Sequence, residues 1–562
     1  MSDQGGKGGR RLLGQVLKRR GAVQESDIQE ALEAQRKQGG LIGQHLVALG
    51  VCSLDDVTQA LAEQAGLEAV DVTGFQPGDD ALGAVDSTTA HAYGILPLSL
   101  RGDVLEVALA DPLNTAVLED LSFSTGHQVV GRLAESQALR TRITELYGEE
   151  QSLAQAIDAA ATSGVGDDLE EAASAAPVVR LLNSILFRAV RDRASDVHFE
   201  VFEEAFRIRY RVDGSLYEVE SPPAHLAPAL ISRIKVLSDL DIAETKIPQD
   251  GRIALAIDGR AVDLRVATLP GVSGEGAVLR VLDRTAVSLD LSLLGFPEGD
   301  ERVLRALTRL PNGIVLVTGP TGSGKTTTLY SMLAEANSPD VKIITVEDPV
   351  EYDIDGIVQV PINDEIGVDY AAILRTVLRQ DPDKILVGEI RDGATAATAI
   401  EASLTGHTVF ATVHTNDAPS AVTRMLDMGV EPFLLTATME AVLAQRLVRR
   451  VCSTCATKYE PDEQLLRELG PDAERLRGAE LTFGKGCEDC FHTGYRGRTA
   501  LGEVMRMDAD LRQAILAGES TGALRQRARA AGMRTLRESG IEAVLAGTTT
   551  IDEVLRETAA TL

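Results

Sequence analysis

The chain has 562 residues, 44% of them apolar and 25% charged, which are ordinary values for a globular protein. Because a single hydrophobic core stops growing at about 250–300 residues, this length predicts about three or four domains. The formal net charge of −29 disfavours nonspecific binding to DNA, RNA or anionic lipid, since each of these needs a positive protein surface.

Targeting signals are absent from the sequence as it stands. No run of about 18 apolar residues occurs, so no transmembrane helix is predicted, and the start MSDQGGKGGR lacks the apolar segment of a secretory signal. The first 20 residues carry six Lys/Arg and one Asp, which we interpret as a frayed terminus, with a contact site for a partner or membrane as the alternative. Four of the five cysteines form CxxC pairs, which favours a metal in a reducing compartment over disulfides. We therefore expect a protein of the cytoplasm.

The N-terminal region contains an internal repeat. Residues 12–35 (LLGQVLKRRGAVQESDIQEALEAQ) recur at 41–64 (LIGQHLVALGVCSLDDVTQALAEQ), with nine identical positions among 24. Each copy has the pattern of a short helix, a turn at a glycine, an acidic helix start and an amphipathic helix. The repeat predicts two packed helix pairs at the start of a mostly helical α+β domain over 1–148, with short strands such as VLEVALA.

Composition then suggests a linker and a second domain. Residues 149–174 are rich in Ala and acidic residues and contain no Lys or Arg, which indicates a flexible linker. Residues 175–285 begin with an amphipathic helix and continue as alternating strands, among them FRIRYRVDGSLYEV with its DG turn. We expect a compact α+β domain there.

From residue 286 the pattern changes to apolar strands separated by helical segments. The runs GIVLVTG, KIITVED, KILVGEI and HTVFATVH are nearly continuous in apolar residues. Such runs with crossover helices predict a mostly parallel sheet covered on both faces, that is, an α/β domain over 286–562. Its end, residues 505–562, has a helical and polar pattern.

The segment IVLVTGPTGSGKTT, residues 314–327, carries a candidate phosphate-binding loop. It fits G-x-x-x-x-G-K-[ST], follows an apolar strand and precedes a helical segment. Glycines let backbone N–H groups point at phosphates, the lysine adds a positive charge, and the next hydroxyl can ligate Mg²⁺. The pattern predicts a site for ATP and Mg²⁺. Its residues are Gly319, Pro320, Thr321, Gly322, Ser323, Gly324, Lys325, Thr326 and Thr327, with Thr326 as the Mg²⁺ ligand.

Acidic residues and histidines end the neighbouring strands. KIITVEDPVEY places Glu347, Asp348 and Glu351 after one strand, and KILVGEIRD places Glu389 after another. Carboxylates at strand ends beside such a loop are positioned to orient Mg²⁺ and polarise water, although alone they would be ordinary solvated caps. His407 and His414 lie at the two ends of a further strand, where contact with the γ-phosphate is one interpretation and the structural role of most histidines near strands is the alternative.

Two cysteine pairs predict a metal centre. Cys452-x-x-Cys455 and Cys487-x-x-Cys490 are separated by 31 residues, longer than the usual spacing, but four thiolates suit tetrahedral Zn²⁺. We expect a structural zinc element over 450–498, with a redox pair as the alternative.

Together these motifs resemble one family, the secretion and type IV pilus assembly ATPases, also called traffic ATPases. The resemblance spans nearly the whole chain and rests on GPTGSGKTTT, TVEDPVEY, LRQDPDKILVGEIRD and TGHTVFATVHTNDA, with ASDVHFE, QDGRI and GYRGRT. It implies a RecA-like P-loop core, a preceding PAS-like α+β domain and an N-terminal domain of the MshEN kind. It also implies a homohexamer with ATP between subunits, while the acidic charge balance argues against nucleic acid as a partner.

The resemblance further implies roles for single residues. Lys325 and Thr326 hold phosphates and Mg²⁺, Glu351 is the catalytic base for water, Glu389 is the Walker B acid, and His414 contacts the γ-phosphate. Arginines of the preceding domain are candidates to reach the nucleotide from the same or an adjacent subunit, with a solvated strand face as the alternative. They are Arg209, Arg252, Arg265 and Arg280.

The resemblance leaves the driven process open between two machines. EYDIDG, ASLTGH and VTRMLDMGVEPFLL favour type II secretion, whereas the N-terminal repeat is common in pilus assembly motors. In either case we expect a peripheral protein at an inner-membrane platform. Some members bind cyclic di-GMP through an arginine that here is replaced by Leu12 and Leu41, which argues against that ligand. A DNA motor such as a helicase is disfavoured because the chain is acidic and lacks a basic, aromatic-rich channel.

Overall fold

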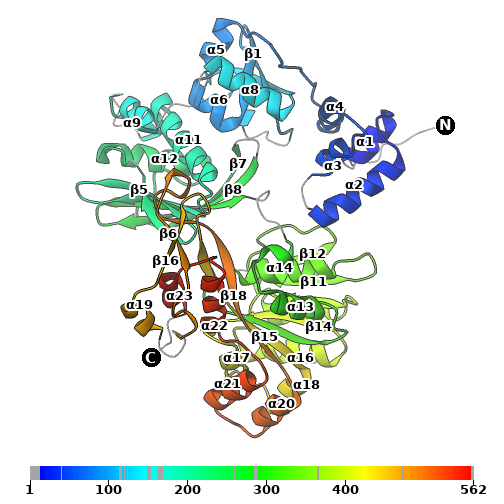
Figure 1. Cartoon of the computed structure of the whole chain (residues 1–562). Helices are drawn as coiled ribbons and strands as arrows, with labels where there is room; N and C mark the ends of the chain where they lie inside the picture. Colours follow the sequence, from blue (N-terminus) through cyan, green and yellow to red (C-terminus); the bar gives the residue numbers. More distant parts are fainter. Residues whose placement is uncertain are drawn as a thin grey trace, which may run out of the picture. The chain divides into compact units, whose positions relative to one another are not determined.

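The computed structural model describes residues 13–38, 41–112, 117–118, 121–122, 125–147, 153–162, 169–219, 221–257, 260–283, 289–363, 366–469 and 474–558. The chain divides into two compact units, Met1–Val287 and Ser288–Leu562 (Figure 1). Among the described residues, no helix combines the length and apolar character that crossing a bilayer requires.

The two sequence repeats fold as two helix pairs. The first pair is α1 (Leu13–Arg19) with α2 (Glu25–Gln38), and the second is α3 (Ile42–Ala48) with α4 (Leu54–Ala65). Equivalent apolar positions of both copies meet in a small separate core that includes Leu17, which is the counterpart of Leu46. The helical prediction for the repeats is therefore confirmed for their described residues.

A small three-stranded sheet follows the repeats. Strand β1 (Ile95–Arg101) pairs antiparallel with β2 (Val104–Leu109), which pairs parallel with β3 (Gln128–Leu133). Helices flank it in sequence and pack on its apolar side. They are α5 (Asp79–Ala84), α6 (Ser87–Tyr93) and α8 (Ser136–Tyr147).

The flexible linker expected over 149–174 is wrong for the residues that the structure describes there. Residues Leu153–Thr162 form α9 and residues Leu169–Ser174 form α10. Leu153, Ala156 and Ile157, together with Ala160, are buried on one face of α9, which packs on α11 (Ala176–Arg191). Their spacing is that of an amphipathic helix, and alanine favours the helix, so composition alone misled the prediction.

The second half of the first unit is a six-stranded antiparallel sheet with strand order β6-β5-β4-β9-β8-β7. Helices α11 and α12 (Ala227–Leu237) cover one face, where alternate residues such as Phe199, Ile208 and Val266 are buried. The intervening residues, many of them charged, form the other face. The strands are β4 (Asp196–Val201), β5 (Phe206–Val212), β6 (Ser215–Glu218), β7 (Gln249–Ile257), β8 (Arg260–Gly271) and β9 (Gly274–Asp283). The PAS-like label for this sheet stays a prediction.

The second unit is built on a seven-stranded sheet with order β12-β11-β13-β14-β10-β15-β18. All of its neighbours pair parallel except the edge strand β18, which is antiparallel to β15. This confirms the α/β class. The strands are β10 (Gly313–Thr318), β11 (Ile343–Glu347), β12 (Ile357–Pro361), β13 (Lys384–Val387), β14 (Thr408–Val413), β15 (Met439–Val451) and β18 (Tyr495–Arg506).

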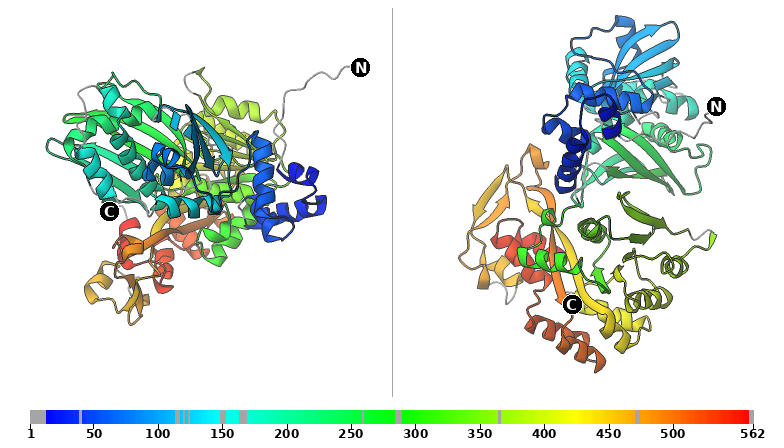
Figure 2. Two further views of the ribbon diagram at one scale, coloured as in Figure 1. Left: turned by 90° about the horizontal axis from the view of Figure 1, so that it is seen from above. Right: turned by 90° about the vertical axis from the view of Figure 1, so that its right-hand side faces the viewer.

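Helices cover both faces of this sheet, as the apolar strands predict (Figure 2). In β10, Ile314 and Leu316 belong to the core on one face, whereas Val315 and Val317 belong to the core on the other. Helices α13 (Glu298–Leu307) and α14 (Lys325–Ala336) lie on the Val315 side. The helices on the Ile314 side include α15 (Tyr370–Val377), α16 (Gly393–Leu404), α17 (Ala418–Asp427) and α18 (Pro432–Thr438).

The excursion between β15 and β18 carries the cysteines. It contains the antiparallel pair β16 (Ala456–Tyr459) and β17 (Leu481–Gly484) and the short helix α19 (Glu463–Glu468). Its apolar residues form a small core with the last two helices. The C-terminal helices, whose existence the sequence predicted, are α20 (Ala509–Leu516), α21 (Thr521–Ala530), α22 (Leu536–Leu545) and α23 (Ile551–Glu557).

Candidate active site

The chemistry-bearing residues of the second unit gather at one edge of its sheet. Strands β10, β11, β13 and β14 are parallel, so their carboxyl ends share an edge. Gly319 follows β10, Glu347 ends β11, and Glu389 and His414 come within two residues after β13 and β14. His407 does not join them, because it precedes β14 and its Nδ1 lies 2.8 Å from the Ala402 carbonyl oxygen at the opposite edge. The interpretation that both histidines contact the γ-phosphate is therefore wrong for His407.

The phosphate-binding loop connects β10 to the start of α14. Gly319 has φ +149° and Gly324 has φ +86°, and a Cβ on Gly319 would lie 2.5 Å from the Gln445 carbonyl oxygen. Lys325 Nζ donates to the carbonyls of Gly319 at 2.9 Å and Pro320 at 3.0 Å, so the loop closes around its own lysine. The Thr326 side chain one residue later is exposed at the helix start.

Burial sets the charge balance at this loop. The pKa of the Lys325 ammonium lies below its usual value mainly because burial penalises the charged form, and the nearby Arg446 lowers it further. The Glu389 carboxylate opposes both effects. An added anion would supply the negative charge that this partly buried ammonium needs.

Gln445 on β15 holds the phosphate-binding loop through its side-chain amide, and the sequence analysis did not identify this residue. Its side chain is 2% exposed, and its Nε2 donates to the Ser323 carbonyl oxygen at 2.9 Å. Its Oε1 accepts from Thr328 Oγ1 on α14 at 2.7 Å. A lone amide within the apolar stretch AVLAQRLV was the only sequence signal for this residue.

Glu389 is the centre of a polar group beside the loop. His414 Nε2 lies 3.0 Å from Glu389 Oε1, and Arg391 Nε donates to Glu389 Oε2 at 2.7 Å. Arg391 also reaches Asp348, at 3.6 Å between Nη1 and Oδ2. The structure thus brings together residues from three separate strand ends, as the motifs predicted.

The acidic segment after β11 contains one buried and one half-buried glutamate. Glu347 is 4% exposed, and the hydroxyls of Tyr330 and Thr345 donate to it. Glu351 is half-buried in the following loop, where its backbone N–H lies 3.4 Å from the Tyr330 hydroxyl oxygen. Of these two glutamates, Glu351 is therefore the one with access to solvent.

Three of the four arginines proposed in the first unit form one row across its sheet. Arg252 on β7 pairs with Arg265 on β8, which pairs with Arg280 on β9, and Arg280 pairs with Asp196 on β4. Residues paired in this way share a face of the sheet. Arg280 Nε lies 3.3 Å from Asp196 Oδ1. We call these three arginines the arginine row.

Arg209 lies outside the arginine row. Its Nε and Nη2 contact the two carboxylate oxygens of Glu200 at 2.6 and 2.5 Å. Such a bidentate ion pair occupies the planar edge of the guanidinium. Arg209 is therefore a weaker candidate for an anion contact than the arginine row.

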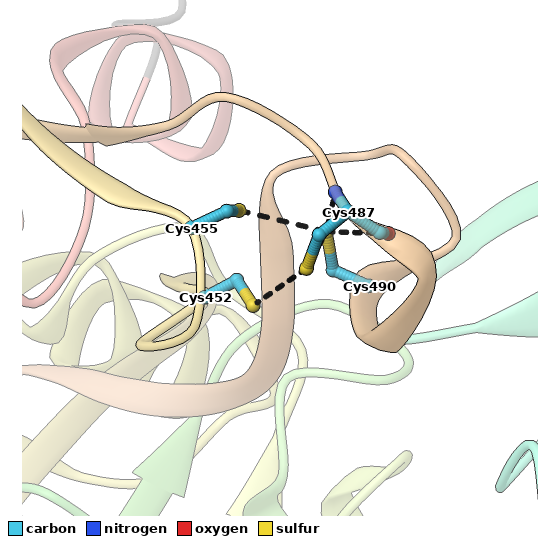
Figure 3. A group of neighbouring side chains, drawn as sticks. All are labelled: Cys452, Cys455, Cys487 and Cys490. Atoms are coloured by element: carbon cyan, nitrogen blue, oxygen red, sulfur yellow. Dashed lines mark hydrogen bonds between the residues drawn. The ribbon is translucent and has the colours of Figure 1, made fainter.

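The four cysteines meet in one cluster, drawn in Figure 3. The sulfur atoms lie within 4.8 Å of one another, with Cys452–Cys487 and Cys455–Cys490 at 3.8 Å and Cys487–Cys490 at 3.7 Å. Four sulfurs about 2.3 Å from one central ion would be about 3.8 Å apart in a regular tetrahedron, and a disulfide would need about 2.05 Å.

Backbone N–H groups point at the sulfurs of this cluster. Gly486 donates to Cys455 Sγ at 3.3 Å, and Cys487 and Gly494 donate to Cys490 Sγ at 3.2 and 3.3 Å. Such donors stabilise thiolates and are the usual outer partners of metal ligands. The donor set and its spacing fit Zn²⁺.

A family model settles where the chain belongs. Residues 171–556, more than half of the chain, match the family described as type II/IV secretion system protein. The chain belongs to this family. Its members are ATPases that serve secretion and pilus assembly, so this chain is an ATP-hydrolysing enzyme of that kind. Residues 65–153 match the MshEN domain.

Curated relatives divide between the two machines. The chain is 41% identical over 562 residues to the type IV pilus assembly ATPase PilB of Myxococcus xanthus, covering 97% of this chain and 99% of the relative. It is 42% identical over 565 residues to the type II secretion system protein E of Xanthomonas campestris pv. campestris, covering 98% of each. The two likenesses are equal in extent, so they establish a secretion or pilus assembly ATPase without separating the two.

A solved structure agrees with the fold. The ATPase DotB of Yersinia pseudotuberculosis covers 68% of this chain and 93% of its own, with a TM-score of 0.51 and 21% identity. At this identity the likeness shows the fold alone.

Proposed function

We propose that this chain is the cytoplasmic ATPase that powers type II protein secretion, acting as a homohexamer that drives pseudopilin assembly through an inner-membrane platform. The observation that carries the proposal is the sheet edge that the phosphate loop shares with Glu389 and His414, with Glu351 in the segment that follows β11. Among the relatives, the type II secretion system protein E of Dickeya dadantii is 50% identical over 394 residues, which supports secretion.

The phosphate loop and its neighbours hold ATP and Mg²⁺ in this proposal. Backbone N–H groups of Gly319–Gly324 and the Lys325 ammonium bind the phosphates, and the exposed Thr326 hydroxyl ligates Mg²⁺. On binding, Lys325 would exchange its two loop carbonyls for phosphate oxygens. Bound Mg²⁺ would neutralise charge on the phosphates.

Three side chains then act on the water and the terminal phosphate. Glu351 takes the proton from the attacking water, Glu389 orients the Mg²⁺ shell, and His414 donates to the γ-phosphate. The contact between His414 and Glu389 supports this division, because the carboxylate fixes the imidazole orientation. Nothing in the site requires covalent catalysis.

The arginine row supplies further positive charge in this proposal. Its three guanidiniums would neutralise charge that develops on the transferred phosphate, after ATP binding moves the 175–285 domain within a subunit or brings in an adjacent subunit. Their cross-strand register, with Asp196 as the acidic neighbour in the row, supports an anion as the intended partner. The four cysteines hold a structural Zn²⁺ that closes the 450–498 element.

Pilus assembly is the second candidate function. It is favoured by the Myxococcus xanthus relative, which matches over nearly its whole length, N-terminal region included. A cyclic di-GMP response is a lesser candidate. The position that would carry a ligand-binding arginine is Leu41 in the second repeat, where the side chain is 66% exposed, and Leu12, its counterpart, lies outside the described residues.

The test of the enzymatic proposal is a Lys325→Ala chain. Mg²⁺-dependent phosphate release by the purified full-length protein should fall by about 10³-fold or more, because the lysine charge at the phosphates is lost. Lys342→Ala, which removes an exposed lysine before β11, is the matched control and should keep turnover. Full turnover by Lys325→Ala would overturn the phosphate assignment.

The test of the biological role uses the same substitution in cells. A strain that carries Lys325→Ala at the natural locus should lose export of folded proteins to the medium while surface pili remain. Loss of pili with normal export would assign the chain to pilus assembly instead. Restoring the wild-type chain should reverse whichever defect appears.

A further inference from the structure

Glu347 is a buried carboxylate whose hydrogen-bond partners are uncharged. Its Oε2 accepts from the Tyr330 hydroxyl, and its Oε1 accepts from Thr345 Oγ1 at 2.5 Å and Gln359 Nε2 at 3.2 Å. Burying a carboxylate is costly unless several donors replace its water. Here the three donors are side chains of α14, β11 and β12. Because all three bind the same carboxylate, that carboxylate fixes their positions relative to one another.

Two of these three donors also hold the loop that carries Glu351. Gln359 Nε2 donates to the Tyr352 carbonyl at 2.9 Å, and Gln359 Oε1 accepts from the Ile354 N–H at 2.7 Å. The Glu351 N–H points at the Tyr330 hydroxyl oxygen at 3.4 Å. The Tyr330 and Tyr352 rings meet edge-on, with centroids 6.1 Å apart. Residues 351–354 are therefore attached to the Glu347 network by three backbone hydrogen bonds and one ring contact.

Tyr330 also connects this network to the phosphate loop. It lies on α14, the helix that begins with Lys325 and Thr326, and its ring is completely buried. Tyr330 comes five positions after Lys325, so the two lie less than two helical turns apart on one rigid element. A shift at the start of α14 would move the Tyr330 hydroxyl, and with it the Glu351 loop.

The hydroxyl of Tyr330 stays protonated over the working pH range. Burial raises its pKa far above the usual value, and the hydrogen bond to Glu347 raises it further. The hydroxyl consequently donates to Glu347, and its oxygen accepts from the Glu351 N–H and from Gln359 Nε2, each at 3.4 Å. Phenylalanine would preserve the ring packing and remove all three contacts.

We propose that Tyr330, Glu347 and Gln359 are positioning residues that place Glu351 to take the proton from the water that attacks ATP bound at the start of α14. The proposal rests on the assignment of Glu351 as the base. It goes beyond that assignment by naming the groups that couple the phosphate loop to the base. A purely structural network would stabilise the fold equally whether or not Glu351 acts.

The test is a double-mutant cycle between Tyr330→Phe and Glu351→Gln in the full-length chain. Single-turnover phosphate release and KM for ATP are measured for each single variant and for the double variant. Tyr330→Phe should slow phosphate release by about tenfold to a hundredfold with KM within about threefold, because a displaced base loses alignment while nucleotide binding persists. In the Glu351→Gln background the same change should slow release by less than about twofold.

The controls separate the possible failures. Tyr459→Phe removes a hydroxyl from a tyrosine of the four-cysteine element and should leave release unchanged. Gln359→Met removes the contacts that Gln359 on β12 makes with the 351–354 segment, so it should slow phosphate release as Tyr330→Phe does. It replaces Tyr330→Phe in the experiment if that variant does not fold. Equal losses in both Glu351 backgrounds would overturn the positioning role. Unimpaired release by Glu351→Gln alone would instead overturn the base assignment.

Discussion

The phosphate loop of the second unit and the arginine row of the first are both suited to anions, but they are built in opposite ways. The loop uses contiguous residues and backbone N–H groups, and its Lys325 is satisfied by two carbonyls of the same loop. The arginine row gathers side chains from β7, β8 and β9, with Asp196 beside Arg280 at its end.

This difference has energetic consequences. A backbone cradle binds an anion without bringing like charges together, so it can be stable when empty. Like charges directly opposite each other on adjacent strands destabilise a sheet. In the arginine row this repulsion acts between neighbouring guanidiniums, and an added anion would reduce it. The loop and the row are thus expected to respond differently to substitution.

The largest effect is expected from closing the backbone cradle. Gly319→Ala should abolish Mg²⁺-dependent phosphate release and lower the free energy of unfolding by about 1–3 kcal/mol, because the new Cβ would meet the Gln445 carbonyl at 2.5 Å. The matched control is Gly322→Ala, whose Cβ would meet nothing within 4 Å. Gly322→Ala should lower the free energy of unfolding less than Gly319→Ala does, because its only cost is the backbone strain of an alanine at φ +79°. Equal stability losses would show that space is not what Gly319 provides.

A smaller loss of turnover, with little effect on stability, is expected in the arginine row. Arg265→Gln should slow phosphate release by about tenfold or more, since an arginine at a transferred phosphate is worth orders of magnitude. The free energy of unfolding should change by no more than about a few tenths of a kcal/mol, because relief of repulsion from Arg252 and Arg280 offsets the interactions that Arg265 itself loses. Arg207→Gln, on the same outer face but outside the row, is the control for turnover and for thermal unfolding. If Arg265→Gln keeps full turnover, the arginine row does not act on the phosphate and is only part of a solvated sheet face.

The smallest effect on turnover is expected from the four-cysteine cluster. Removing metal with a chelator, or Cys487→Ser, should lower the midpoint of thermal unfolding, while phosphate release well below that midpoint stays within about twofold. The sulfurs occupy the excursion between β15 and β18, away in sequence from the phosphate loop. Cys52→Ser, outside the cluster, should change neither quantity. A loss of turnover before any loss of folded protein would contradict a structural role.

The sequence analysis succeeded where the residues of a functional motif lie close together along the chain. The phosphate loop, the strand-end acids and both CxxC pairs are local patterns, and the parallel sheet follows from runs such as GIVLVTG. It failed at 149–174, where an alanine-rich acidic segment was interpreted by composition although its apolar spacing favoured the helix α9. It also grouped His407 with His414, although His407 precedes its strand and only the carboxyl end of a parallel strand shares the edge with the loop.

The sequence by itself determined the family, the α/β class, the phosphate loop and the thiolate ligands, because spacings of a few residues impose these features. Only the tertiary structure decided that Gln445 supports the loop, that three arginines share a row, and that Tyr330 and Gln359 hold the Glu351 loop. The physical reason is distance along the chain. Strand register and helix packing bring these groups together, and no local pattern of residues encodes which partners will meet.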